Sequence, residues 1–307
     1  MKFIEQKRAH IPAKTEFIKH KFLDIQYAPG NERRTLDIYL PNDGEGPYPV
    51  IIDIYGGGWY FGQKSSYKME PALELLRRGF AVVSINYSLS YQAKFPTQVQ
   101  EVKASIRYVR KHAAEFQLDP SRIALMGESA GAHYATLAAC STACGKLIDG
   151  SWPNQDVSDE VQAVIAVYCP VNIGLTREYF AVQQELNGLE PLVREFGESD
   201  SPEGVLLGGV PKEVPEMVEL ANPANYLNEK CPPFLFLHGD QDQVVPIICT
   251  MAFAAKMMYA TSIDNVKFQL VKDARHDILD FEKEWIYDLE VQFLRDKMHI
   301  EGQGEQP

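Results

Sequence analysis

The spacing of apolar positions changes partway along the chain. Two β-like runs near the N-terminus, at residues 16–28 and 34–41, are separated by a Pro-Gly-Asn-Glu turn at residues 29–32. Runs joined so closely predict an antiparallel pair of strands. From residue 48 onward, apolar runs of strand length alternate with longer segments of helical period. This alternation is typical of a mostly parallel sheet with helices on both faces.

The remainder of the chain contains six more candidate strands and five candidate helices. The strands are predicted at residues 49–55, 80–88, 122–127, 161–169, 232–239 and 266–273. The helices are predicted at residues 71–78, 97–116, 130–140, 246–260 and 279–298. The second helix has apolar residues at three- and four-residue steps, the pattern of a helix packed on a sheet: Val99, Val102, Ile106, Val109 and Ala113. The sequence therefore predicts an α/β fold with a sheet of about eight strands.

One polar stretch, residues 172–230, interrupts the alternation after the sixth predicted strand. It is rich in Glu, Gly and Pro and contains only short helical patches. We expect it to be a lid or a wall of the active site, inserted within one domain that spans residues 1–307. The composition of the tail, residues 301–307, predicts disorder.

The charge and composition exclude several classes of protein. The net charge is −12 and no long run of Lys or Arg is present, so nucleic acid is not an expected partner. No continuous apolar stretch has the length of a secretory signal or a membrane span, so we expect a cytoplasmic protein that does not enter a membrane. A homodimer is compatible with the sequence.

The cysteines and histidines do not have the spacing of a metal site. Five cysteines, at positions 140, 144, 169, 231 and 249, are odd in number and lack C-x-x-C spacing, so free thiols are expected. The chain has no H-E-x-x-H motif. We therefore expect neither a metal nor a cofactor.

The strongest local motif is Gly-Glu-Ser-Ala-Gly at residues 127–131. It follows a predicted strand directly and precedes a predicted helix. A nucleophile elbow requires this context, because small residues must flank a Ser in a turn so tight. The helix N-terminus also favours negative charge that develops beside Ser129. Ser129 is therefore the candidate nucleophile.

A serine hydroxyl needs a base to take its proton and an acid to orient that base. The histidines downstream of Ser129 are His238, His276 and His299. His276 is the best candidate base, because it lies on a loop after the last predicted strand. The acid is expected after the preceding strand, where carboxylates emerge at the same sheet edge as Ser129. Asp242 is preferred there, and Asp240 is the alternative with a turn-fixing role.

A glycine-rich segment, Tyr-Gly-Gly-Gly-Trp at residues 55–59, follows the strand predicted at 49–55. Glycines let backbone N–H groups approach a substrate without a Cβ in the way. We predict an oxyanion hole from the N–H groups of Gly57, Gly58 and Ala130. A phosphate-binding loop would need a following Lys-Ser or Lys-Thr, or G-x-G-x-x-G spacing, and the segment has neither.

These motifs resemble the hormone-sensitive-lipase-like branch of the α/β-hydrolases, and within it the small bacterial acetyl-xylan and feruloyl-type carboxylesterases. The resemblance rests on YGGGW, on the segment from INYSLSYQ to GESAGAH, and on HGDQDQVVP with the later His276. It implies an α/β-hydrolase fold, a lipase-like serine esterase, the triad Ser129–His276–Asp242, and oxyanion donors at Gly57, Gly58 and Ala130.

The chain departs from this family's pattern at two places. Tyr55 stands where the glycine-rich loop usually begins with His, so a hydrogen bond from the imidazole must be replaced or lost. The base usually lies in a Gly-rich context, whereas here Arg275 and Asp277 flank His276. These residues place charges near the base that can alter the substrate preference.

Several nearby residues have structural interpretations. His133 is expected to be a hydrogen-bonded structural histidine, since its place on the elbow helix directs it away from Ser129. Glu128 is expected to support the elbow without reacting. The aromatic residues 59–61 either line a pocket or serve packing.

Three functions remain open from the sequence. The leading one is hydrolysis of short-chain or small acyl esters, which include acetylated or feruloylated sugars. The first alternative is a peptidase or amidase of the same fold. The second is a non-catalytic relative that binds a small ligand.

Overall fold

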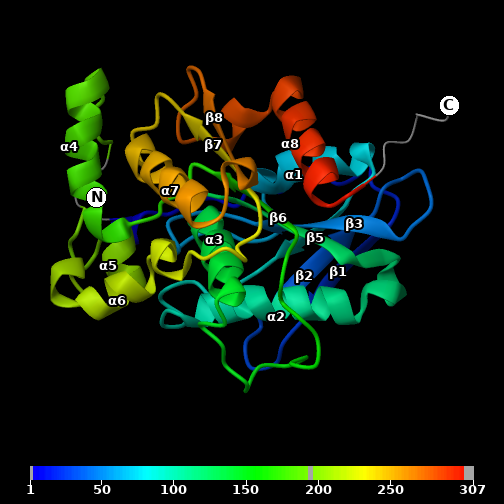
Figure 1. Cartoon of the computed structure of the whole chain (residues 1–307). Coiled ribbons are helices and arrows are strands. Elements are labelled where there is room, and N and C mark those ends of the chain that lie inside the picture. The colour runs from blue at the N-terminus through cyan, green and yellow to red at the C-terminus, as the bar shows by residue number, and fades with distance from the viewer. Residues whose placement is uncertain (1–2, 193–195, 301–307) are drawn as a thin grey trace.

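An eight-stranded sheet runs through the protein in the computed structural model, which describes residues 3–192 and 196–300 (Figure 1). The strands are β1 (Lys21–Gln26), β2 (Thr35–Tyr39), β3 (Tyr48–Ile54), β4 (Ala81–Ile85), β5 (Leu118–Glu128), β6 (Ala163–Val167), β7 (Phe234–Gly239) and β8 (Val266–Val271). Their order is β1-β2-β4-β3-β5-β6-β7-β8. β1 and β2, and β2 and β4, pair antiparallel, and the other neighbours are parallel. The tail at 301–307 lies outside the described residues.

Helices cover both faces of the sheet. They are α1 (Glu70–Glu74), α2 (Thr97–Lys111), α3 (Ala130–Ala143), α4 (Thr176–Asn187), α5 (Pro202–Leu207), α6 (Pro215–Leu220), α7 (Ile247–Ala260) and α8 (Glu284–Lys297). Figure 1 shows α2 and α3 on one side of the sheet and α1 and α8 on the other. None of the helices in this described part is both long enough and apolar enough to cross a lipid bilayer.

The predicted strands and the antiparallel N-terminal pair are confirmed, with differences at the ends of elements. The first strand begins at residue 21 and not at 16, because the preceding residues turn: Ile18 N–H donates to the Thr15 carbonyl, and Lys19 N–H to Asn42 Oδ1. β5 begins at Leu118, four residues early, because Leu118 pairs with Tyr48 ahead of a register shift.

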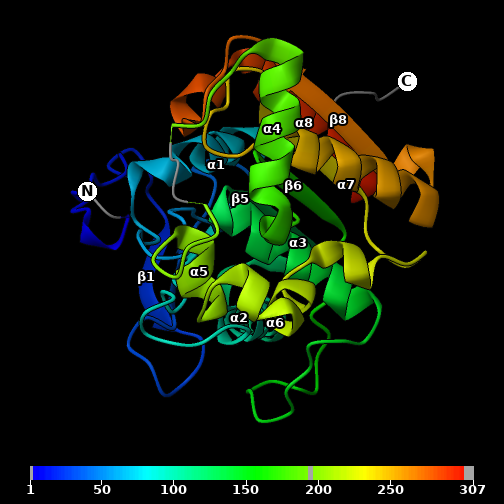
Figure 2. The same cartoon turned by 90° about the vertical axis from the view of Figure 1, so that its left-hand side faces the viewer.

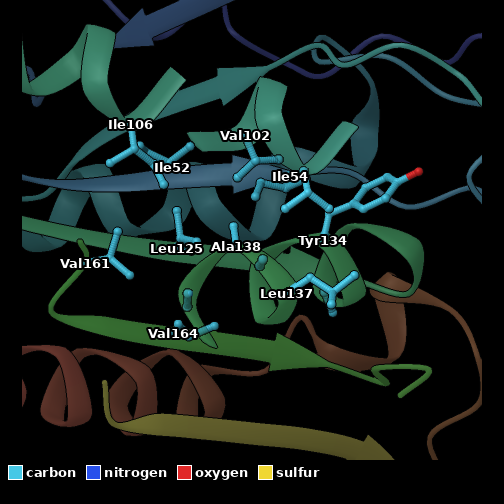
Figure 3. Close-up of a cluster of buried hydrophobic side chains, with 14 of the residues drawn as sticks. Ile52, Ile54, Val102, Ile106, Leu125, Tyr134, Leu137, Ala138, Val161 and Val164 are labelled. Atoms are coloured by element: carbon cyan, nitrogen blue, oxygen red, sulfur yellow. The ribbon is translucent and has the colours of Figure 1, made fainter. Parts of the chain in front are cut away.

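The strands bury alternate residues on opposite faces. In β3, Val50, Ile52 and Ile54 belong to the core beneath α2, α3 and α7, whereas Ile51 belongs to the core beneath α1 and α8. Figure 3 shows side chains of the first of these cores, among them Ile54 of β3, Val102 of α2 and Leu137 of α3. Two-sided burial explains why these strands are continuous apolar runs. Burial on both faces also holds the carboxyl ends of these strands in place along one edge of the sheet.

The stretch between β6 and β7 carries α4, α5 and α6. These helices lie together at one end of the molecule, at the left in Figure 1 and in front in Figure 2. Residues 193–195 of the stretch lie outside the described residues. The N-terminal segment approaches the same end of the molecule, since Phe3 and Pro202 both lie next to Gly58.

Candidate active site

Ser129 occupies the sharp turn between β5 and α3. Its backbone has φ 53° and ψ −123°, outside the regions that L-residues usually adopt. A Cβ on Gly127 would lie 2.6 Å from the backbone of Gly131, and a Cβ on Gly131 would lie 1.9 Å from the Ile54 carbonyl oxygen. Only glycine fits at both flanking positions, so the turn has the geometry of a nucleophile elbow.

The structure brings Ser129, His276 and Asp242 together. His276 Nε2 lies 2.9 Å from Ser129 Oγ, and His276 Nδ1 lies 2.8 Å from Asp242 Oδ2. A carboxylate can only accept, so Nδ1 carries the proton and Nε2 is free to accept from the serine hydroxyl. The imidazole packs against the Tyr168 ring, with 4.3 Å between ring centroids, which limits its rotation.

Asp242 is buried and ionised. Its Oδ1 accepts from the N–H groups of Val244 and Val245, and its Oδ2 faces His276 and, at 3.3 Å, His238. Burial alone would raise the pKa of Asp242, but the charge of His276 and hydrogen bonds from both histidines outweigh it and hold that pKa well below its ordinary value. The acid therefore remains a carboxylate that can fix the tautomer of His276.

The other candidates for acid and base have structural partners. Asp240 Oδ1 accepts from the Asp273 N–H at 2.7 Å, so it joins the loops after β7 and β8. His238 is buried and bonds to Thr250 Oγ1 and to the Val245 carbonyl. His299 is exposed after α8, and its carbonyl accepts from Arg122.

Two of the three predicted oxyanion donors, Gly57 and Gly58, line the same pocket as Ser129, and the third, Ala130, follows Ser129 in the chain. Gly57 (φ 138°) and Gly58 (φ 59°) have backbone conformations that favour glycine, and a Cβ on Gly57 would lie 2.3 Å from the Phe61 carbonyl oxygen. Ala130 is the first residue of α3, so its N–H has no carbonyl partner within the helix. Within the described residues, none of these three N–H groups donates to a protein acceptor. Their role as oxyanion donors stays a prediction.

Glu128 braces the glycine-rich loop. Its buried carboxylate accepts from the Gly56 N–H at 2.5 Å and from Lys68 Nζ at 2.7 Å. Burial alone would raise the pKa of Glu128, but the Lys68 charge and hydrogen bond, together with His276 and the Gly56 N–H, bring it below the ordinary value. Glu128 therefore stays charged and ties β5 to the loop that carries Gly57 and Gly58.

A phenol takes the place that the family usually gives to an imidazole. Tyr55 Oη accepts from Arg33 Nη2 at 2.6 Å, and the Tyr55 ring stacks on Tyr87 with 4.5 Å between centroids. Arg33 also donates to the Gly62 carbonyl, at the other end of the loop. The loop is thus held at both ends without a histidine.

The charges beside the base are engaged locally. Arg275 pairs with Asp280 through Nε and Oδ2 at 3.0 Å, and Asp277 accepts from the Leu279 N–H. Both interactions shape the turn that leads into α8. Among the described residues, the His276 ring bonds to Asp242 and Ser129 and not to either flanking charge.

His133 has the structural role predicted for it. Its Nδ1 accepts from Trp59 Nε1 at 3.2 Å and its Nε2 donates to the Ala221 carbonyl at 2.8 Å. Burial lowers the pKa of His133 to about 4, so the ring is neutral. Trp59 also lines the pocket above Ser129, whereas Tyr60 and Phe61 pack on Phe3.

A pocket of about 410 Å³ opens above Ser129. Part of its lining is apolar and comes from the segments after β6 and β7, namely Pro170, Val171, Ile173, Val244, Val245 and Pro246. The stretch between β6 and β7 adds Leu192, Phe196 and Pro202 to this wall. Its helix α4 also supports the acid, because Gln183 Nε2 donates to the Asp242 carbonyl at 2.8 Å and Gln183 Oε1 accepts from Ile247 N–H.

The supporting side chains that the sequence did not reveal include Lys68, Tyr168 and Gln183. None of them stands in a recognisable motif, and each acts through a partner distant in the chain. The pairing of Lys68 with Glu128 joins residues 60 positions apart. In the described ranges, no group of three or more His, Cys, Asp and Glu side chains could hold a metal, and the five cysteines are free thiols.

The fold and this arrangement define an α/β-hydrolase, with a Ser–His–Asp group at the carboxyl edge of a mostly parallel sheet. The chain belongs to the BD-FAE family, whose model matches residues 36–257.

Relatives and solved structures agree with this membership. Esterase LipQ of Mycobacterium tuberculosis (strain ATCC 25618 / H37Rv) is 30% identical over 87% of this chain and 59% of its own length. A probable isoprenylcysteine alpha-carbonyl methylesterase, ICMEL1 of Arabidopsis thaliana, is 30% identical over 72% of this chain and 44% of its own length. The chain thus spans about half the length of these curated relatives.

A truncated form of a carbohydrate esterase from gut microbiota superposes with a TM-score of 0.80 and 28% identity, covering 94% of this chain and 99% of that one. The bifunctional GH43-CE of Bacteroides eggerthii has a TM-score of 0.76 and 30% identity over 91% of this chain and 35% of its own. An esterase of Thermogutta terrifontis, Est2, shares the fold at 22% identity, with a TM-score of 0.69, over 96% of this chain and 97% of its own.

Proposed function

We propose that this chain is a serine carboxylesterase that hydrolyses small acyl esters through an acyl-enzyme. The observation that carries the proposal is the contact of one imidazole with both partners: His276 lies 2.9 Å from Ser129 Oγ and 2.8 Å from Asp242 Oδ2. The esterase names of the relatives support the same reaction.

The reaction has two steps: transfer of the acyl group from the ester to Ser129, and its transfer from Ser129 to water. Ser129 gives its proton to His276 Nε2 while Oγ bonds to the ester carbonyl carbon, and Asp242 stabilises the resulting imidazolium. The N–H groups of Gly57, Gly58 and Ala130 bind the oxyanion, and each such donor lowers the barrier by about 3 kcal/mol. The alcohol then leaves with the proton from His276. A water molecule repeats the sequence on the acyl-serine and releases the acid.

The substrates we propose are short or small acyl esters, with acylated sugars among them. Two of the similar structures bear the names carbohydrate esterase and GH43-CE, and the pocket of about 410 Å³ has room for a small acyl group beside its apolar wall. We further propose that residues 172–230 form a lid-like insertion within a single domain. Its contribution to the pocket wall and the Gln183 contacts support this role.

The test compares hydrolysis of p-nitrophenyl acetate and butyrate by the wild type and by Ser129→Ala. We expect the variant to lose nearly all activity, because it lacks the attacking oxygen. Equal rates would remove Ser129 from the mechanism. p-Nitroacetanilide, an amide, tests the amidase alternative and should be cleaved far more slowly. Binding of these esters without hydrolysis would support the second alternative, a non-catalytic relative that binds a small ligand.

A further inference from the structure

The N-terminal segment places a cation in the wall of the active-site pocket. Arg8 lines the same pocket as Ser129, together with Gln6 and Lys68. The segment is anchored beyond Arg8, where the Tyr67 N–H donates to the Ile11 carbonyl at 2.8 Å and Ala13 N–H donates to the Ser65 carbonyl. Arg8 therefore reaches the pocket from a fixed backbone.

Aromatic rings hold the Arg8 guanidinium in place. Its Cζ lies 4.8 Å from the centroid of Phe61 and 5.9 Å from that of Phe3, both within cation–π range. Nη2 also donates to Gln6 Oε1 at 3.3 Å. These contacts occupy the face of the guanidinium and one of its N–H groups. The remaining donors are left for a ligand, since the group has five.

In the described part of the chain, the Arg8 guanidinium has no direct ion-pair partner, although the nearby charge of Glu128 acts on it. Within residues 3–192 and 196–300, no carboxylate lies within ion-pair distance of it. Lys68, the other cation of the lining, forms an ion pair with Glu128. The carboxylates of Glu203 and Asp277 are held by the backbone N–H groups of Gly197 and Leu279 and do not pair with Arg8. An unpaired cation in the site of a chain with net charge −12 is the feature that an anionic ligand would complement.

We propose that Arg8 binds a carboxylate carried by the ester substrate, on either its acid part or its alcohol part. The proposal rests on the proposed esterase function and names the class of substrate. Arginine suits this role because its planar fork donates two parallel hydrogen bonds to a carboxylate. Arg8 is then a specificity-determining residue that lowers KM for anionic esters.

The experiment uses two matched pairs of esters on the full chain. In the first pair, 4-acetoxybenzoate and its methyl ester differ by a carboxylate on the alcohol part. In the second pair, monoethyl succinate and the isosteric ethyl 4-methylpentanoate differ by a carboxylate on the acid part. The ratio of kcat/KM within each pair reports selectivity for the carboxylate, and the two pairs show which side of the ester Arg8 contacts.

We expect Arg8→Gln to lower the ratio about tenfold in at least one pair, mainly through KM, which is the typical effect of losing one partly exposed charge-assisted hydrogen bond. Arg8→Lys should keep part of the selectivity. The matched control is Lys7→Gln, which removes the same charge from an exposed neighbour outside the pocket lining and should leave both ratios unchanged.

Unchanged ratios in Arg8→Gln, or an equal fall in Lys7→Gln, would overturn the proposal. An Arg8→Gln effect of the same size on both members of each pair would also overturn it, since that pattern indicates a structural role. If the wild type hydrolyses the neutral esters and not the anionic ones, the esterase function is supported and the proposal for Arg8 is overturned. Hydrolysis of none of the four esters would contradict the esterase function itself.

Discussion

The two oxygens of the Asp242 carboxylate serve different parts of the site. Oδ1 holds the turn through the N–H groups of Val244 and Val245, and Oδ2 receives the proton-bearing nitrogen of His276. An asparagine could keep the first set of contacts through its oxygen. Its NH₂ group would then face His276 Nδ1 and select the tautomer with the proton on Nε2.

We therefore expect Asp242→Asn to fold normally and to lose roughly 1,000- to 10,000-fold in kcat, because Nε2 can no longer accept the Ser129 proton. Steady-state hydrolysis of p-nitrophenyl acetate measures the effect. Asp240→Asn is the matched control, since the Asp240 carboxylate accepts from the Asp273 N–H, a contact that an amide oxygen can keep. A loss in the Asp240 variant as large as in the Asp242 variant would contradict the assignment.

At the residue scale, the sequence was most informative where a backbone constraint selects one residue type. Gly127 and Gly131 are such residues, because any Cβ there would collide with neighbouring backbone. Tyr55 shows the opposite case. Its partner Arg33 lies 22 positions away, and no local pattern indicates that a guanidinium braces that phenol.

The glycine-rich loop depends on an ion pair between two other elements. Glu128 ends β5, and Lys68 lies in a short helical turn before α1. Both the Gly56 N–H of the loop and Lys68 Nζ donate to the Glu128 carboxylate. Burial raises the pKa of Glu128, and the charge and hydrogen bond of Lys68 are the largest causes that lower it, so loss of Lys68 shifts that pKa upward. A neutral or displaced Glu128 would hold the loop less firmly.

We expect Lys68→Met to lower kcat for p-nitrophenyl acetate by roughly 10- to 100-fold, because small displacements of oxyanion donors are costly. Lys68→Arg should restore much of the activity, since it keeps the charge next to Glu128. The control is Lys14→Met, which removes an exposed lysine 3.8 Å from Glu70 and should behave as wild type. A rise in KM with kcat unchanged would show that Lys68 binds substrate and does not position the loop.

At the element scale, the strands could be predicted because burial on both faces makes them apolar throughout. Helix α8 was predicted to begin at residue 279, but it begins at Glu284, after a short turn that Asp277 caps. The support that α4 gives to Asp242 could not be predicted. Gln183 lies in a polar stretch, and its buried contacts form only when α4 packs beside α7.

The packing of α8 on the sheet gives the whole molecule a pH dependence. Glu290 of α8 is 2% exposed and its Oε2 has no hydrogen-bond partner within the described chain. Burial raises the pKa of Glu290 from 4.5 to about 8. The folded protein therefore retains a proton that the unfolded chain loses above about pH 4.5, so stability falls as the pH rises through this window.

We expect Glu290→Gln to gain stability relative to the wild type as the pH rises from 5 to 9. The difference in unfolding free energy between the variant and the wild type should change by on the order of 5 kcal/mol at most. This limit follows from the rise in the pKa of Glu290 from 4.5 to about 8. Urea unfolding at several pH values measures it, with the exposed Glu229→Gln variant as control. A difference between Glu290→Gln and wild type that is constant over this range would contradict the burial argument.

The central claim is that His276 and Asp242 activate Ser129, and covalent labelling with a fluorophosphonate tests it most directly. Peptide mapping by mass spectrometry should find one label, on Ser129, in the wild type. Labelling should be absent in Ser129→Ala and much slower in Asp242→Asn. A label on another residue, or labelling of Ser129→Ala at the wild-type rate, would contradict the account.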